Sequence, residues 1–124
     1  MPQGSTTFHE SEEHLSPATR DLHRAVVSLM EELEAVDWYQ QRIDATQDNE
    51  LREILRHNRD EEKEHAAMVL EWIRRRDTAF DAKLREYLFT EGSIVGREDA
   101  FADGGAGANA NGTEPSVGSL RGAP

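Results

Sequence analysis

The chain has 124 residues, a net charge of −11 from 25 acidic and 14 basic residues, and no cysteine. Disulfide frameworks, thiolate zinc sites and iron–sulfur clusters are therefore excluded, so any metal must be held by oxygen and imidazole ligands. The acidic balance argues against nucleic acid or an anionic membrane as a partner, and the lack of a long apolar run predicts a cytoplasmic protein with one small domain.

The first 15 residues mix polar and charged side chains without a regular period, which is typical of a flexible arm. His9 and His14 lie among glutamates and could bind a metal ion there. A solvated tail is the favoured interpretation, because nothing in this pattern fixes a ligand geometry. Residues 1–15 are therefore predicted to precede a helical domain that spans residues 16–95.

A long helix is predicted from Pro17 to about Asp44. Ser16 followed by Pro17 is typical of an N-cap and first helical turn, and no glycine or proline interrupts the stretch that follows. Glu32 lies beside the predicted packed side, and Tyr39 follows it by one heptad on the same face. The packed side is defined by steps of four and three residues, which visit Leu22, Val26, Leu29, Leu33, Val36, Gln40 and Ile43.

The far side of this helix carries a second stripe, formed by Val27, Glu31, Glu34 and Trp38. One interpretation is a solvated acidic face with one amphipathic aromatic residue. The other is a weak cation site where two subunits meet.

A second helix is predicted from about Asn49 to Arg75. The short polar connection before it is typical of antiparallel neighbours, with Asp48 or Asn49 as the N-cap. A shorter third helix is expected from about Thr78 to Phe89, with Gly92 as its terminator. The predicted fold is thus all-α: a two-helix antiparallel hairpin plus a short C-terminal helix. The apolar side chains of the third helix are Phe80, Leu84, Tyr87, Leu88 and Phe89.

Ionisable groups occupy the side of the predicted second helix that should be buried against other helices. Steps of four and three visit Leu51, Leu55, Asn58, Glu62, His65, Val69 and Trp72. Burying a carboxylate and an imidazole costs several kcal/mol unless they are paired, protonated or bound to a cation. Glu62 and His65 are three positions apart, so their side chains point the same way and can hold one ion.

The first helix supplies a third ligand at the same level. If the turn centres near Gln47, Glu32 and Glu62 each lie about 15 residues, or roughly 22 Å, from it. An antiparallel hairpin therefore places the two carboxylates side by side. Glu61, four residues before His65, is an alternative to Glu62, but Glu62 keeps the step of four and three and is preferred. Glu61 and Glu64 are then expected to face solvent or to assist as outer groups.

One chain holds half of a known type of metal site. Di-iron centres in ferritin-like four-helix bundles use one Glu from each of two helices and a Glu-x-x-His from each of the other two. Two copies of Glu32, Glu62 and His65, related by a two-fold axis, complete that set. A chain this small also needs a partner to cover its apolar side. We therefore expect a dimer that forms a four-helix bundle.

Three segments carry a resemblance to the encapsulated ferritins. They are "MEELEAVDWY" (Met30 to Tyr39), "HNRDEEKEHAAM" (His57 to Met68) and "YLFTEG" (Tyr87 to Gly92), and the similarity covers roughly residues 20–95. The resemblance implies a two-helix chain that dimerises into a four-helix bundle, with dimers assembled into a ring-shaped homodecamer. It implies a ferroxidase centre between two chains.

Several site residues follow from that resemblance. It implies Glu32, Glu62 and His65 as iron ligands of a di-iron centre, with Tyr39 beside them. It also implies that the second stripe of the first helix is a site where metal enters. That site consists of Glu31 and Glu34, with Trp38 nearby.

The last part of the chain differs in composition from the helical domain. Residues 96–115 become rich in Gly, Ala and Asn, which predicts a flexible linker. The segment "SVGSLRG" in residues 116–124 is similar to the peptides that dock cargo inside an encapsulin shell. Val117 and Leu120 would form a small apolar plug for a groove on that partner. The matching core of the peptide is Val117, Gly118, Ser119 and Leu120.

The expected activity is oxidation of Fe(II) to Fe(III) by dioxygen, because hard anionic oxygen ligands stabilise the higher charge. By the resemblance, the iron would be stored in the lumen of an encapsulin nanocompartment, since an open ring has no interior. A rubrerythrin-like peroxidase or di-iron oxygenase ranks lower, because no cysteine cluster is present to deliver electrons. A non-enzymatic helical scaffold, in which the polar residues only fix the register, is the remaining alternative.

Overall fold

The computed structural model describes residues 4–98, which fall into two units: residues 4–77 and residues 78–98. The predicted targeting peptide, most of the predicted linker and the first three residues lie outside the described range. The described part is all-helical, as predicted, with four elements in order. Within it, no helix combines the length and the apolar character that a membrane crossing requires.

Helix α1 spans Pro17–Ala45, close to the predicted range. The Ser16 hydroxyl accepts a hydrogen bond from the backbone N–H of Thr19 at 3.0 Å, which satisfies one of the free donors of the first turn. Pro17 occupies the first helical position, where its missing N–H costs nothing. The predicted start signal is therefore confirmed.

Residues 4–15 contain a short 3₁₀ helix, η1 (Glu12–His14), that the sequence did not indicate. Arg20 donates a hydrogen bond to the carbonyl oxygen of Glu12 at 3.1 Å, and the Phe8 ring lies 4.4 Å from the ring of His23. This part of the predicted arm thus contacts the first turns of α1. A hydrogen bond from a side chain to the backbone of a residue eight positions away leaves no periodic pattern in the sequence.

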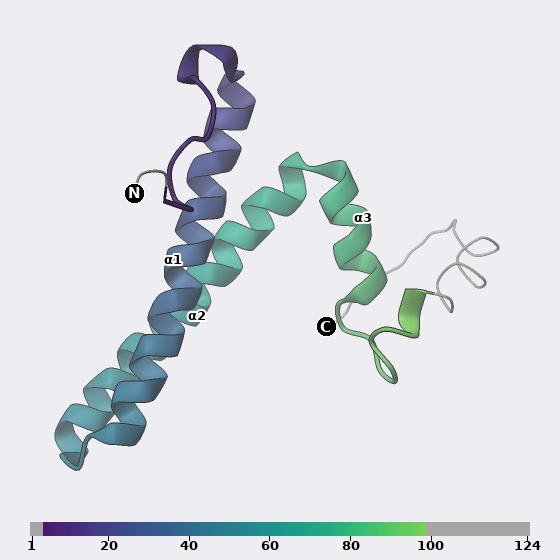
Figure 1. Ribbon diagram of the computed structural model, residues 1–124. Coiled ribbons are helices and arrows are strands. Elements are labelled where there is room, and N and C mark those ends of the chain that lie inside the picture. Colours follow the sequence, from purple (N-terminus) through teal and green to yellow (C-terminus); the bar gives the residue numbers. More distant parts are fainter. Residues whose placement is uncertain (1–3, 99–124) are drawn as a thin grey trace. The chain divides into compact units, whose positions relative to one another are not determined.

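Helix α2 spans Asn49–Arg76 and runs antiparallel to α1 (Figure 1). The Asp48 carboxylate accepts from the N–H of Leu51 at 2.9 Å, which makes Asp48 the N-cap. Arg52 closes the connection, because its guanidinium donates to the carbonyl oxygens of Ile43, at 3.2 Å, and Thr46. These carbonyls end α1 and have no partner inside the helix. One arginine therefore fixes the hairpin turn.

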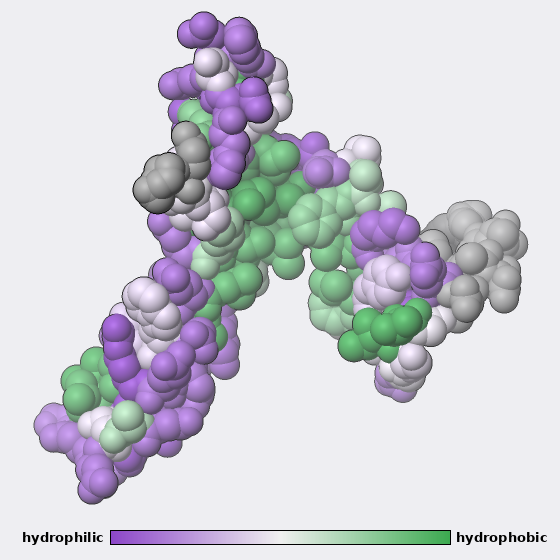
Figure 2. Space-filling model, in the orientation of Figure 1, coloured by the Kyte–Doolittle hydropathy of each residue, from purple (hydrophilic) through white to green (hydrophobic). Residues whose placement is uncertain are grey.

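The predicted packed side of α1 divides into two lines. Leu22, Leu29, Val36 and Ile43, one per heptad, are partly or fully buried. Val26, Leu33 and Gln40, the other position of each heptad, are exposed, and the Leu33 side chain is 55% exposed. A single hairpin gives α1 only one neighbouring helix, so only one line is covered. Figure 2 shows apolar side chains at the surface of the hairpin.

Helix α3 spans Thr78–Tyr87 and ends two residues before the predicted Phe89. Phe89 has a φ of 60°, outside the right-handed helical region, and is 95% exposed. Gly92, with a φ of 85°, follows the helix but does not end it. The buried residue of α3 is Glu86, which accepts from Lys83 Nζ at 3.2 Å. Of the apolar side chains predicted for this helix, Phe80, Leu88 and Phe89 are exposed, and a paired carboxylate is buried instead.

Candidate metal centre

Three side chains from α1 and α2 converge in the middle of the hairpin. One ligand atom each of Glu32, Glu62 and His65 lies within 4.8 Å of the others. His65 Nδ1 is 3.3 Å from Glu62 Oε1 and 3.7 Å from Glu32 Oε1. The two carboxylates thus lie at one level of the hairpin, as the distance from the turn indicated. Glu62 and His65 share a face because they are three residues apart on α2.

The three groups are only partly covered by their own chain. The side chains of Glu32 and Glu62 are 25% and 24% exposed, and that of His65 is 41% exposed. Within residues 4–98, the ion pairs of these two glutamates are with His65, and none is with lysine or arginine. The cluster is therefore acidic, partly desolvated and without a fixed cation.

The three groups shift one another's pKa values. The hydrogen bond to Glu62 raises the pKa of Glu32, and burial and repulsion from Glu62 act in the same direction. The same hydrogen bond lowers the pKa of Glu62. The shifts are opposite because two adjacent carboxylates cannot both ionise easily, so Glu32 keeps its proton to a higher pH than Glu62 does. Glu62 also raises the pKa of His65, so the imidazole tends to stay protonated.

Such a donor set suits a hard divalent or trivalent ion. Two carboxylates and one imidazole match the ligands used for iron in helical bundles. A bound cation would compete with protons at Glu32 and His65, and it would offset the repulsion between the two glutamates. One chain supplies only three donors, so the set is incomplete for two metal ions.

Glu61, the alternative to Glu62, lies on the other side of the imidazole. Its Oε1 is 3.9 Å from His65 Nε2, and its Oε2 is 3.8 Å from His57 Nε2. The structure therefore groups Glu62, rather than Glu61, with Glu32. Glu64 is exposed.

Tyr39 is half-buried and lies one heptad after Glu32. The guanidinium of Arg42 lies 5.6 Å from the centre of its ring. That contact is a cation–π interaction within α1. The described contact of Tyr39 is thus with Arg42 and not with the three converging groups.

The residues of the predicted metal-entering stripe are exposed on α1. Glu31 and Glu34 are exposed, and Trp38 lies 6.0 Å from the Arg42 guanidinium. Glu31 adds to the repulsion that raises the pKa of Glu32. Among the described residues, the three-residue centre is the one cluster with ligand spacing. The role of the stripe therefore stays a prediction.

The histidines of the N-terminal segment do not gather a ligand set. His9 Nε2 lies 3.1 Å from the carbonyl oxygen of Gly4, and His14 is exposed in η1. Whether they bind a metal ion stays untested.

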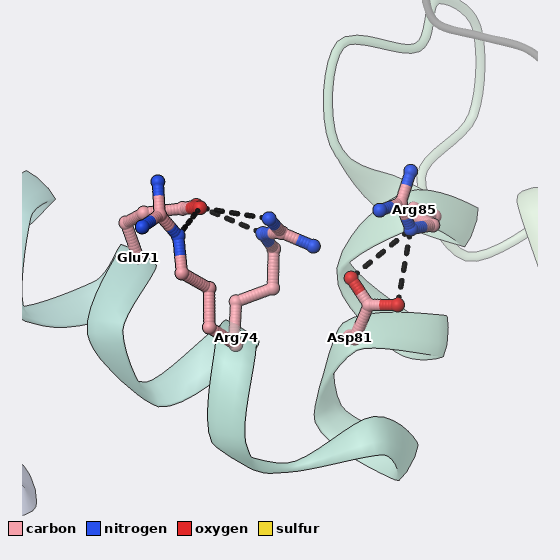
Figure 3. A network of polar contacts seen from close by, with 5 residues as sticks. Glu71, Arg74, Asp81 and Arg85 are labelled. Atoms are coloured by element: carbon pink, nitrogen blue, oxygen red, sulfur yellow. Dashed lines mark hydrogen bonds and ion pairs between the residues drawn. The ribbon is translucent and has the colours of Figure 1, made fainter.

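Sequence analysis missed a second carboxylate cluster near the end of α2. Glu71 accepts hydrogen bonds from Arg74, at 2.8 and 2.7 Å, and from Arg75, at 2.7 Å (Figure 3). These bonds lower the pKa of Glu71 to about 2. The spacing of three and four residues between Glu71 and the two arginines is the signal in the sequence that could have found this cluster. In the second unit, Arg85 pairs with Asp81 at 3.0 Å in the same manner.

Comparison with known proteins gives consistent matches. The sequence model of the EncFtn-like family matches residues 7–91. An encapsulated ferritin-like protein of Rhodospirillum rubrum is 53% identical over 130 residues, which cover 98% of this chain and 93% of the relative. A ferritin-like protein of Thermotoga maritima is 50% identical, over 78% of this chain and 85% of the relative.

Two further matches extend this picture. The encapsulin nanocompartment cargo protein EncC of Myxococcus xanthus is 32% identical and covers 98% of this chain and 99% of its own length. The crystal structure of protein ne0167 from Nitrosomonas europaea superimposes with a TM-score of 0.69 at 63% identity. It covers 70% of this chain and 96% of the solved chain.

Proposed function

The chain belongs to the EncFtn-like family of encapsulated ferritin-like proteins, and we propose that it oxidises Fe(II) to Fe(III) with dioxygen at a site shared by two subunits. The observation that carries this proposal is the convergence of Glu32, Glu62 and His65 within 4.8 Å, without a fixed cation. Iron is the substrate of this reaction, and the three residues bind it.

The partial exposure of the centre supports a site shared between two chains. His65 keeps 41% of its side chain exposed, and apolar side chains of the same hairpin are exposed as well. A two-fold axis near Glu62 brings each residue against its own copy and doubles the donor set. It also covers the exposed line of α1 and lets two hairpins form a four-helix bundle. The exposed apolar side chains of the hairpin include Val26, Met30, Leu33, Ile54 and Met68.

In the proposed reaction, electrons pass from Fe(II) to dioxygen, which also takes up protons. Two Fe(II) ions each lose one electron, and one dioxygen molecule takes up both electrons and two protons to reach the level of hydrogen peroxide. Glu32 and Glu62 stabilise the higher charge of the product ions because carboxylates are hard, anionic ligands. His65 binds through Nδ1, the ring nitrogen that faces both glutamates. Iron binding competes with protons at Glu32 and His65, because the pKa values of both groups are raised.

The family membership suggests where the oxidised iron goes. Relatives are described as an encapsulated protein and as a nanocompartment cargo protein. We propose that this chain also works in the lumen of an encapsulin shell, as a ring-shaped decamer that supplies oxidised iron for storage. Residues 116–124 would dock to the shell through Val117 and Leu120, and Glu31 and Glu34, beside Trp38, would draw metal toward the centre.

Oxygen consumption after anaerobic loading with Fe(II) tests the activity. Glu32→Ala and His65→Ala should reduce the rate to that of uncatalysed oxidation, because each removes a ligand. Glu71→Ala is the matched control, since Glu71 is already neutralised by two arginines. Wild-type rates equal to the uncatalysed rate would instead support a helical scaffold.

Coexpression with a candidate encapsulin tests the location. The full chain should copurify with assembled shells, and a chain that lacks residues 113–124 should not. Equal copurification of both chains would contradict a C-terminal docking peptide.

A further inference from the structure

A line of three ionisable residues runs along α2 beside the metal centre. His57, Glu61 and His65 are spaced by four residues, so their side chains are neighbours on one face. The two carboxylate oxygens of Glu61 face different histidines, with Oε2 3.8 Å from His57 Nε2 and Oε1 3.9 Å from His65 Nε2. Glu61 therefore lies between a proposed metal ligand and an exposed histidine.

The two nitrogens of His65 face different carboxylates. Nδ1 is 3.3 Å from Glu62 Oε1, whereas Nε2 faces Glu61. A neutral imidazole carries one proton, and only the other nitrogen has a free electron pair for a metal ion. If the proton stays on Nδ1, it is donated to Glu62 and blocks the position where iron would bind. The placement of this single proton therefore decides whether His65 can act as a ligand.

We propose that Glu61 is a positioning residue that accepts the Nε2–H of His65 and thereby directs the free electron pair of Nδ1 between Glu32 and Glu62. This inference rests on the proposed metal centre. Carboxylates that bind the outer N–H of a ligand histidine fix its tautomer and ring orientation in many metal sites. The 3.9 Å separation is longer than a hydrogen bond, but Glu61 is half exposed, so its carboxylate has room to turn toward Nε2.

The geometry separates this role from that of a ligand. Glu61 lies on the Nε2 side of the ring, away from the point where Glu32, Glu62 and Nδ1 converge. Its second oxygen lies 3.8 Å from His57 Nε2, further along the same face of α2. Glu61 thus acts on iron through the imidazole.

Anaerobic Co(II) titration of the full chain tests the proposal, because binding is measured without iron oxidation. Glu61→Ala should weaken Co(II) binding by about 10- to 100-fold, the usual effect of losing an outer carboxylate. Glu61→Gln should recover much of this loss, since its amide oxygen can accept the same hydrogen bond. Glu64→Ala is the matched control: it removes the same charge next to His65 in sequence and should change affinity by about threefold or less.

Nitrogen-15 NMR of the histidine rings gives a second readout, at a pH where His65 is neutral. The wild-type chain should carry the proton on Nε2 of His65, and Glu61→Ala should increase the population with the proton on Nδ1. An unchanged tautomer, together with equal Co(II) affinities of Glu61→Ala and Glu64→Ala, would overturn the proposal. So would a failure of Glu61→Gln to recover binding, with an altered Co(II) absorption spectrum, because Glu61 would then be a ligand.

The same titration separates this inference from the proposed function. If wild-type protein and Glu62→Ala bind Co(II) equally weakly, the metal centre itself is contradicted. If wild-type protein binds Co(II) well and Glu62→Ala does not, the centre stands, and the Glu61 variants decide the inference alone.

Discussion

Two glutamates on α2, Glu71 and Glu62, lie in opposite electrostatic environments. Glu71 is held by Arg74 and Arg75 at 2.7 to 2.8 Å, and its pKa falls to about 2 (Figure 3). Glu62 faces Glu32 and His65, and within residues 4–98 it has no ion pair with lysine or arginine. Glu71 is neutralised by its own helix. Glu62 instead lies beside a second carboxylate and an imidazole, and a metal cation would neutralise the two carboxylates.

An arginine placed in the metal centre should neutralise its carboxylates, as Arg74 and Arg75 neutralise Glu71. His65→Arg provides a fixed positive charge for Glu32 and Glu62, and it removes the imidazole ligand. Catalysed Fe(II) oxidation should fall to the uncatalysed rate, the largest effect expected here, while the melting temperature stays equal to or above that of the wild type. Oxygen consumption and circular dichroism measure both. Retained oxidation in a folded variant would contradict the role of the imidazole.

Metal should strengthen association of subunits only through the Glu62 cluster. At a free metal concentration of 100 times Kd, binding to the assembled form alone stabilises it by about 2.7 kcal/mol. Analytical ultracentrifugation should show a shift toward dimers or larger rings when Co(II) is added anaerobically. Glu62→Ala should abolish the shift, and Glu71→Ala should leave it unchanged. An equal shift in both variants would place the metal outside the centre.

Metal affinity should rise with pH through the neutral range. The pKa values of Glu32 and His65 are both raised, so these groups hold protons that metal must displace. Each proton released makes affinity about tenfold stronger per pH unit until the group is deprotonated. Calorimetry in buffers of different ionisation enthalpy counts the protons. Binding that is independent of pH would show that the metal does not replace them.

The Glu71 cluster should contribute to stability and not to metal binding. Because the pKa of Glu71 is lowered, its ionised carboxylate stabilises the fold at pH values above about 4.5. This stabilisation is lost as the pH falls from about 4.5 to about 2. Because the Glu71 side chain is 42% exposed, Glu71→Gln should cost about 1 kcal/mol or less at neutral pH. Urea unfolding should show the difference at pH 7 and its disappearance near pH 2. A difference that persists at low pH would contradict the ion-pair explanation.

Much of the hairpin was predictable because local rules govern it. Ser16 with Pro17, and Asp48, set the helix starts through caps that need only neighbouring residues. The level of Glu32 and Glu62 followed from the constant rise of two antiparallel helices. The three-residue spacing then placed His65 beside Glu62.

The missed features depend on contacts between residues far apart or on backbone angles. Arg52 closes the turn by bonding carbonyl oxygens of α1, and Arg59 donates to Gln40 across the hairpin at 2.8 Å. Helix α3 ends early because Phe89 adopts a positive φ, which is uncommon for an aromatic residue. The exposure of Leu33 depends on how many helices surround α1. None of these follows from spacing alone.

A crystal structure of the protein loaded anaerobically with Fe(II), with anomalous scattering to locate iron, tests the shared centre most directly. We expect two iron ions near a two-fold axis, each close to Glu32, Glu62 and His65 side chains, with both subunits contributing ligands. Iron held by one subunit alone, with the His65 imidazole turned into bulk solvent and away from any neighbouring chain, would contradict it.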